Sequence, residues 1–215
     1  MRVLVIGGTG TIGSAIVRSL SAQHDVLVAC RSVRDTPVDI TDPDLIRQLF
    51  ERIGTVDAVV CAAGEAVFKP LDELSDDDHG VASKLMGQVN VVRHGHPFVQ
   101  DGGSLTLTSG KLGRRPMPGT TSISLINAAL EGFVRAAALE LPRGLRINAV
   151  SPEWTTGTLE LFGMDPSWGI SAESVAAAYV VAVEGSMTGT VIDAGWLYDP
   201  AADYLTVATG SLAVA

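Results

Sequence analysis

Short runs of apolar, β-branched residues alternate along the chain with longer segments whose apolar positions recur at helical spacing. We expect the short runs to form strands at Val3–Ile6, Asp25–Ala29, Val56–Cys61, Ser104–Thr108, Arg146–Val150 and Thr190–Asp193. The longer segments predict helices at Gly13–Ala22, Asp42–Arg52, Ser75–Val99, Ser122–Leu141 and Ala172–Glu184. Continuous apolar strands separated by helices are typical of a parallel sheet covered on both faces. The pattern therefore predicts an α/β fold of three layers with one doubly wound parallel sheet.

The connection after the second strand departs from this alternation. Only the stretch from Arg31 to Val38 separates that strand from the next extended segment, Val38-Asp39-Ile40. A helical crossover needs about a dozen residues. We therefore expect one crossover helix of the doubly wound pattern to be missing here.

Two helix starts carry recognisable signals. Asp42-Pro43 supplies an N-cap side chain and a first-turn proline. Ser75 is followed by three aspartates, which we interpret as an N-cap and first-turn acids that complement the helix dipole. The short acidic cluster then has a structural explanation and does not indicate an interaction tail.

Composition narrows the class of protein. A chain of 215 residues with 47% hydrophobic and 18% charged residues fits one folded domain. Its net charge of −9 disfavours nucleic acid and anionic membranes as partners. No apolar run reaches the ~18 residues of a membrane span, and the apolar start is too short for a signal peptide. We expect a soluble, cytoplasmic protein.

The cysteines and histidines suggest no metal site. Cys30 and Cys61 end apolar runs, so we interpret them as buried thiols in preference to a disulfide or a nucleophile. His94 and His96 flank a glycine, which is typical of a loose surface pair. No CxxC or HExxH spacing occurs, and we predict no metal ligands.

A glycine-rich turn lies between the first strand and the first helix. In Gly7-Gly8-Thr9-Gly10-Thr11-Ile12-Gly13 the three spaced glycines permit a tight turn, close approach of a pyrophosphate and close packing of helix on strand. The free N–H groups at the helix start favour the pyrophosphate. This context predicts a Rossmann-type dinucleotide site.

The end of the second strand bears on which dinucleotide is bound. It reads Ala29-Cys30-Arg31-Ser32, without the acid that usually binds the ribose hydroxyls of NAD. Arg31 can pair with a 2′-phosphate, so we favour NADP(H) over NAD(H). The alternative is that Arg31 is a solvated loop charge.

At this point the chain resembles the short-chain dehydrogenase/reductase family, over nearly its whole length up to about Trp196. The resemblance is carried by the glycine loop and by Asp39-Ile40, Cys61-Ala62-Ala63-Gly64, the strand ending Thr-Ser109-Gly110, the helix from Asn127 to Leu141, Arg146–Pro152 and Thr188–Trp196. It implies cofactor contacts at Gly7, Thr9, Gly10, Thr11, Ile12, Gly13, Arg31, Ser32, Asp39, Ile40, Ala62, Ala63, Gly64, Pro152 and Thr155.

The positions that are catalytic in the family differ here. The family's Tyr-x-x-x-Lys aligns with Ile123 and Asn127, and its helix Asn aligns with Lys84, while Ser109 matches the family serine. One hypothesis is that the Lys and the Asn have exchanged helices, which would keep one ammonium and one amide together at the site. The alternative is drift in a site that is no longer used. Isoleucine cannot replace the tyrosine as a proton donor.

Other residues offer substitutes for the missing phenol. Lys84 can act as a general acid if burial lowers its pKa. Lys111 could reach the pocket or be a solvated loop residue, and water is another donor. Glu153 and Trp154 replace small residues of the family's nicotinamide loop, either as site groups or as a solvent-facing acid and a packed ring. The stretch from Leu159 to Ile170 predicts a small apolar lid.

Three functions remain open on the sequence. The first is an NADP(H)-dependent oxidoreductase that reduces a carbonyl or an activated double bond with Lys84, Ser109 and Asn127 at its site. The second is a non-redox isomerase, cyclase or lyase on the same scaffold, and the third is a catalytically inactive cofactor-binding protein. We expect a small-molecule substrate and a homodimer or homotetramer, formed through the helices Ser75–Val99 and Ser122–Leu141. Residues 1–198 form the domain, and residues 199–215 form a tail.

Overall fold

All six strands of the sheet run parallel, in the order β2-β1-β3-β4-β5-β6. The computed structural model describes residues 1–75, 78, 80–161 and 163–195. The strands are β1 (Arg2–Ile6), β2 (Asp25–Ala29), β3 (Val56–Cys61), β4 (Val99–Thr108), β5 (Arg146–Ser151) and β6 (Val191–Asp193). The predicted doubly wound sheet is confirmed, with strand ends that differ by a few residues.

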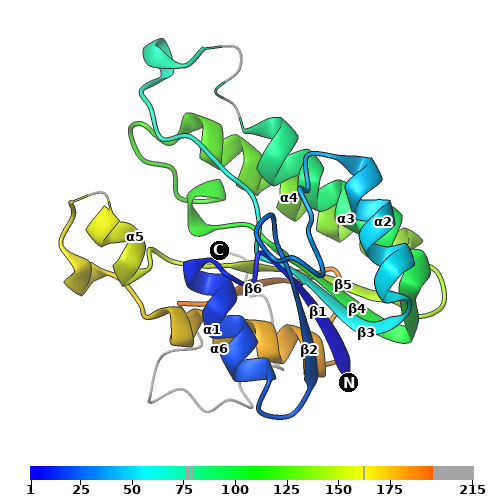
Figure 1. The fold of residues 1–215 in the computed structure, drawn as a ribbon. Coiled ribbons are helices and arrows are strands. Elements are labelled where there is room, and N and C mark those ends of the chain that lie inside the picture. Colours follow the sequence, from blue (N-terminus) through cyan, green and yellow to red (C-terminus); the bar gives the residue numbers. More distant parts are fainter. Residues whose placement is uncertain (76–77, 79, 162, 196–215) are drawn as a thin grey trace.

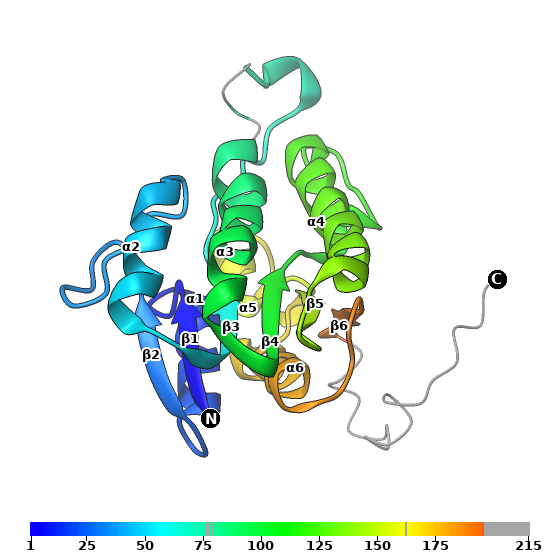
Figure 2. The same ribbon diagram turned by 90° about the vertical axis from the view of Figure 1, so that its right-hand side faces the viewer.

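Helices cover both faces of the sheet, as Figures 1 and 2 show. On one face lie α1 (Thr11–Leu20) and α6 (Ala172–Glu184); on the other lie α2 (Pro43–Ile53), α3 (Gln88–Gly95) and α4 (Thr121–Glu140). The short α5 (Thr156–Leu161), which we did not predict, follows β5 and packs against a 3₁₀ turn, Pro166–Trp168. The result is the predicted three-layer α/β architecture.

Alternation along the strands divides the core in two. In β1, Val3 and Val5 face α1 and α6, whereas Leu4 and Ile6 face α2, α3 and α4, and all four are fully buried. Successive side chains of a strand point to opposite faces, so a strand covered on both sides must be apolar throughout. This is the physical reason for the continuous apolar runs in the sequence.

The segment between β2 and α2 contains no helix, which confirms that one crossover helix is missing there. Residues 30–42 pass instead through an extended stretch, held to the end of β2 by one parallel bridge from Cys30 to Pro37. Val38 and Ile40 are buried and anchor this stretch to the core. Their intervening residue, Asp39, is left facing the carboxyl end of the sheet.

The predicted helix starts have different outcomes. Asp42 caps α2 as expected, accepting hydrogen bonds from the N–H groups of Asp44 and Leu45. The predicted helix Ser75–Val99 is wrong at both ends: a π-helical segment, η2 (Val81–Gly87), leads into α3, a 3₁₀ turn (His96–Phe98) follows, and Val99 belongs to β4.

Asp78, the described residue of the acidic cluster, lies in a turn and not in the first turn of a helix. Gly80 precedes η2 with a left-handed backbone (φ 61°), which interrupts the chain before the helix. The Asp78 carboxylate accepts hydrogen bonds from Lys69 Nζ and from the Ser75 N–H, and these contacts hold its pKa at about 2. Asp76 and Asp77 lie outside the described residues.

Helix α4 is the one described helix that is long and apolar enough to pass for a membrane span by length and composition. Four of its apolar side chains, Ile123, Ile126, Leu130 and Val134, are buried in the protein. The core helix of a soluble protein has this same character. We therefore describe α4 as a core helix of the α2–α3–α4 layer.

A buried polar network fixes the carboxyl end of β4. The side chain of Gln88, fully buried at the start of α3, donates from Nε2 to the Thr108 carbonyl (3.0 Å) and accepts from the Thr108 N–H (2.8 Å). The Thr108 hydroxyl donates to the Cys61 carbonyl and lies 2.7 Å from the Tyr179 hydroxyl. Residues that follow Thr108 thus leave the sheet from a fixed point.

We predict that Gln88→Ala lowers the free energy of unfolding by about 2–4 kcal/mol, because it leaves two buried backbone groups of Thr108 without partners. Chemical denaturation measures the loss. Gln100→Ala, at an exposed position of β4, is the control and should change stability by less than about 0.5 kcal/mol. Equal effects of the two substitutions would contradict the role given to this network.

Candidate functional site

A groove of about 510 Å³ opens at the carboxyl end of the sheet, where β1 lies between β2 and β3. Segments that follow these three strands line it: Gly7 to Gly10 after β1, Cys30 to Ser32 after β2, and Ala62 to Glu65 after β3. In open α/β sheets, ligands bind in the crevice outside the carboxyl ends of the strands, where the strand order reverses. The groove lies at that point.

The floor of the groove depends on two glycines. Gly7 has φ +84°, and a Cβ there would lie 2.8 Å from the backbone of Ala62 and Ala63. A Cβ on Gly13 would lie 2.0 Å from the Gly7 carbonyl oxygen. Both contacts are with backbone, which cannot move aside cheaply. Only glycine therefore lets α1 begin directly above β1, with Gly10 as its N-cap.

The rim of the groove carries charged side chains. Arg31 Nη2 lies 2.8 Å from Glu65 Oε1, and both side chains are exposed. The Asp39 carboxylate accepts hydrogen bonds from the N–H and the hydroxyl of Thr41, which lower its pKa. Arg31 adds a weaker attraction in the same direction. Arg31 is therefore paired with Glu65 at the groove, and its role in phosphate binding stays a prediction.

Both cysteines are free thiols, as expected, but their surroundings differ. Cys61 is buried, and burial raises its pKa to about 12. Cys30 is half-buried at the groove: burial alone would raise its pKa, but hydrogen bonds from Ser32, Thr9 and the backbone of Ser32 and Val33 lower it to about 7. The prediction of a buried thiol is thus wrong for Cys30.

A second, smaller cavity of about 230 Å³ adjoins the groove and shares Gly64 with it. Lys84 from η2, Ser109 from the end of β4, and Ile123 and Asn127 from α4 line it. The three residues predicted for catalysis are therefore brought to one cavity from separate elements. A Cβ on Gly64 would lie 2.7 Å from the Lys84 Cα, so this glycine lets η2 approach the end of β3.

Lys84 presents its ammonium group to this cavity. Its Nζ donates to the Ser109 carbonyl oxygen at 3.0 Å. Burial lowers its pKa to about 8, and no carboxylate of the described residues offsets this. An ammonium with a single carbonyl partner retains two further N–H donors. It can therefore donate to a ligand in the cavity.

Asn127 and Ser109 are both 1% exposed. The Asn127 Oδ1 has no hydrogen-bond partner among the described residues. Gly110 and Gly113 let the segment after β4 lie against this side chain, because a Cβ on either would come within 2.9 Å of Asn127. The asparagine is thus held at the wall of the cavity with a free acceptor, which a hydroxyl or amide donor of a ligand would satisfy.

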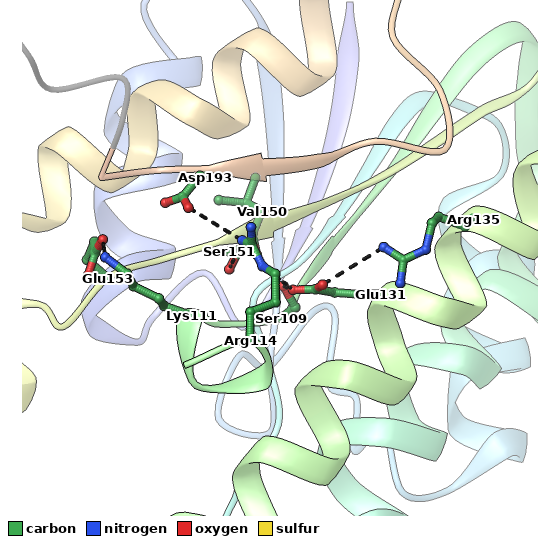
Figure 3. Close-up of polar contacts among 9 residues, drawn as sticks. All are labelled: Ser109, Lys111, Arg114, Glu131, Arg135, Val150, Ser151, Glu153 and Asp193. Carbon is green, nitrogen blue, oxygen red and sulfur yellow. Dashed lines mark hydrogen bonds and ion pairs between the residues drawn. The ribbon is translucent and has the colours of Figure 1, made fainter. Parts of the chain in front are cut away.

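The Ser109 hydroxyl has partners of its own, which Figure 3 shows. It lies 3.4 Å from Glu131 Oε1 and 3.3 Å from the Val150 carbonyl oxygen, and it can donate to either. The Glu131 side chain is 3% exposed and pairs with Arg114 Nε at 3.4 Å. Arg114 in turn donates to Ser151 Oγ and lies 3.5 Å from Asp193 Oδ2.

This network was missed in the sequence because its members come from five separate segments of the chain. Glu131 lies one helical turn after Asn127 on α4, a spacing that puts both on one face and was the only available signal. Arg114 follows the turn η4 (Lys111–Gly113). Nothing in the sequence pairs that arginine with a carboxylate 17 positions away.

The segment after β5 adds further contacts at the second cavity. Glu153 forms an ion pair with Lys111, and Figure 3 shows the two side chains apart from the Glu131 cluster. The Trp154 ring packs against Phe68, with centroids 5.9 Å apart. Trp154 is thus a wall of the cavity. In the predicted lid, Trp168 is 73% exposed, and Phe162 lies outside the described residues.

Comparisons with known proteins agree with this geometry. The family model described as Enoyl-(Acyl carrier protein) reductase, of the short-chain dehydrogenase type, matches residues 11–195. The chain belongs to the short-chain dehydrogenase/reductase family. It is thus a member of an oxidoreductase family with a Rossmann-type fold.

Solved structures of family members resemble the whole domain. The protein lin1944 from Listeria innocua is 38% identical, with a TM-score of 0.86, covering 90% of this chain and 98% of that one. A small-chain dehydrogenase in complex with NADPH is 31% identical, with a TM-score of 0.79, covering 92% and 98%. The hydroxynaphthalene reductase arp2 of Aspergillus fumigatus is 32% identical over 111 residues, which span 50% of this chain but only 41% of that protein.

Within this dehydrogenase fold, the residues predicted for the cofactor divide between the two cavities. Ten of them line the groove: Gly7, Thr9, Gly10, Arg31, Ser32, Asp39, Ile40, Ala62, Ala63 and Gly64. Ile12, Pro152 and Thr155 line the second cavity, which Gly64 also reaches. Thr11 and Gly13 lie at the start of α1 and line neither. Their roles in binding stay predictions.

We predict that Gly13→Ala destabilises the protein by about 1–3 kcal/mol, because the new Cβ meets the Gly7 carbonyl. Helix propensity alone would favour alanine by about 1 kcal/mol, so the sign of the change tests the contact. Gly132→Ala is the matched control within α4, where a Cβ would meet nothing within 4 Å. It should raise the melting temperature, whereas Gly13→Ala should lower it.

Proposed function

We propose that this dehydrogenase is an NADP(H)-dependent oxidoreductase that reduces a carbonyl or an activated double bond of a small molecule. The observation that carries the proposal is the meeting of Lys84, Ser109 and Asn127 at one cavity, continuous with a groove that has a glycine floor and an arginine at its rim. The NADPH complex of a 31% identical relative supports the choice of cofactor.

The residues present fit a dinucleotide. The close approach of Gly7 and Gly13 leaves the start of α1 open to a pyrophosphate, whose charge its free N–H groups favour. Arg31 is the phosphate-binding side chain at the rim. The free Asn127 Oδ1 suits a ribose hydroxyl. When bound, the nicotinamide supplies or accepts a hydride.

Lys84 is the proton donor in this proposal. Ile123, which lines the cavity at the family's tyrosine position, has no proton to give. The Ser109 hydroxyl already lies within donating distance of Glu131 and Val150. Among the described residues, Lys84 Nζ has one hydrogen-bond acceptor, the Ser109 carbonyl. Another of its N–H groups can pass its proton to a substrate oxygen. After transfer, the neutral amine is favoured by its burial.

The non-redox alternative is weaker on the same geometry. It needs a second acid or base, and Glu153 was the candidate. Its carboxylate is instead occupied by the ion pair with the Lys111 ammonium. The remaining alternative is a protein that binds the cofactor without catalysis. Only a measurement of substrate turnover distinguishes it from the proposed oxidoreductase.

We also propose a homodimer formed by the face of η2, α3 and α4. Val81, Met86 and Leu125 are exposed apolar side chains that line a shared hollow of about 890 Å³ on that face. Burial of such side chains is the usual driving force for association. Two free thiols fit a reducing compartment, and we place the protein in the cytoplasm.

The cofactor prediction is that NADPH binds at least tenfold more tightly than NADH, because only NADPH carries a phosphate for Arg31. Titration of the reduced cofactors by fluorescence measures both dissociation constants. A screen of aldehydes, ketones and conjugated enones, followed by loss of NADPH absorbance, then tests turnover. Binding without any turnover would favour the cofactor-holding alternative.

The pH prediction concerns Lys84. Its pKa, lowered to about 8, makes the ammonium the main form below pH 8. Reductive kcat/KM should therefore be constant below about pH 7.5 and fall about tenfold per pH unit above about pH 8.5. Lys84→Met should remove this limb of the profile and lower the rate by about 10²–10⁴.

Lys111→Met is the matched control, because it removes an ammonium from the same cavity that is already paired with Glu153. This variant should keep the alkaline limb near pH 8. If the limb persists in Lys84→Met, another group delivers the proton and the assignment is wrong.

A further inference from the structure

An ion pair crosses the groove from one wall to the other. Arg31 follows β2 and Glu65 follows β3, and these two strands pair with β1 on its opposite sides. The contact from Arg31 Nη2 to Glu65 Oε1, at 2.8 Å, therefore passes over the carboxyl end of β1, where the glycine loop begins. Both residues line the same groove.

The two partners come from segments that are held differently. The Glu65 backbone is anchored, since its N–H donates to Ser83 Oγ at 2.9 Å. Arg31 lies just after β2, in the segment without a helix. Both side chains are exposed, Arg31 at 71% and Glu65 at 74%, so the ion pair can open and let the guanidinium turn toward a ligand.

The charges around Arg31 do not favour an incoming anion. Asp39, which lines the same groove, attracts the same guanidinium. One cation therefore faces two carboxylates here. A 2′-phosphate carries nearly two negative charges at neutral pH, so it must take the arginine from Glu65 and then lie near that carboxylate. The ribose hydroxyl of NAD(H) is neutral and leaves the ion pair in place.

We propose that Glu65 competes with the 2′-phosphate of NADP(H) for Arg31, and so sets how strongly the protein prefers NADP(H) over NAD(H). This inference rests on the proposed cofactor site but makes a separate claim. In it, Arg31 provides the preference and Glu65 limits it. Glu65 is a specificity-determining residue that takes no part in the chemical step.

Removal of the carboxylate charge tests the proposal. Glu65→Gln should tighten NADPH binding about three- to tenfold, the range expected for an exposed ion pair plus repulsion of a nearby dianion. NADH binding should stay unchanged. The effect on NADPH should shrink as salt is raised, because both charges are exposed. Dissociation constants come from fluorescence titration of each cofactor, without any turnover.

Two further variants make the result specific. Asp101→Asn removes an equally exposed carboxylate from a matching ion pair with Arg143, at the amino end of β4, and should change neither affinity. In an Arg31→Ala background, which itself weakens NADPH binding, Glu65→Gln should lose most of its effect on NADPH.

The outcomes separate this inference from the proposed function. If the wild-type protein prefers NADPH and Glu65→Gln tightens NADH equally, weakens NADPH or has no effect, the competition is refuted while the proposed cofactor stands. Persistence of the full effect in the Arg31→Ala background also refutes it. If the wild-type protein binds neither cofactor, both proposals fall.

Discussion

The contact between the start of α1 and the end of β1 is the constraint from which the rest of the site follows. With the Gly13 Cα so placed that a Cβ would lie 2.0 Å from the Gly7 carbonyl, the helix begins directly above the strand. A Cβ on Gly7 would likewise lie only 2.8 Å from the backbone after β3. The ends of β1 and β3 and the helix start are thereby gathered at one place. The groove exists because no side chain fills this point.

Buried hydrogen bonds extend that order to the second cavity. Gln88 binds both backbone groups of Thr108, so the residues after β4 leave the sheet at a fixed position relative to η2 and α3. Lys84 lies one turn before Gln88 on the same helical run, which carries its ammonium to the Ser109 carbonyl. Lys84 and Ser109 are thus both positioned by one buried amide. The chemistry of the cavity thus depends on the Gln88 amide, which is not itself a reactive group.

Much of this could be predicted because it depends on short-range pattern. Apolar runs, helix spacing, the Asp42 cap and the length of the connection after β2 each act over a few residues, and each was confirmed. The predicted start of the helical run at Ser75 was wrong. The left-handed backbone of Gly80 outweighs the N-cap signal of Ser75, and the run begins with η2. Arg114, Glu131 and Glu65 were missed for another reason. Their partners are determined by how distant elements pack, and charge pairing leaves no periodic trace in a sequence.

The pairing of charges around the two cavities distinguishes Lys84 from the other cations of the site. In a protein of net charge −9, the cations near the two cavities are mostly matched: Arg31 with Glu65, Lys111 with Glu153, and Arg114 with Glu131 and Asp193. Lys84 alone among these cations has only a backbone carbonyl as its partner in the described part of the chain. Since burial disfavours its charge, any step that passes its proton to a substrate oxygen relieves that cost. The family's phenol donates as a neutral acid; in the function proposed above, the same task falls to a cation whose surroundings already favour losing the proton.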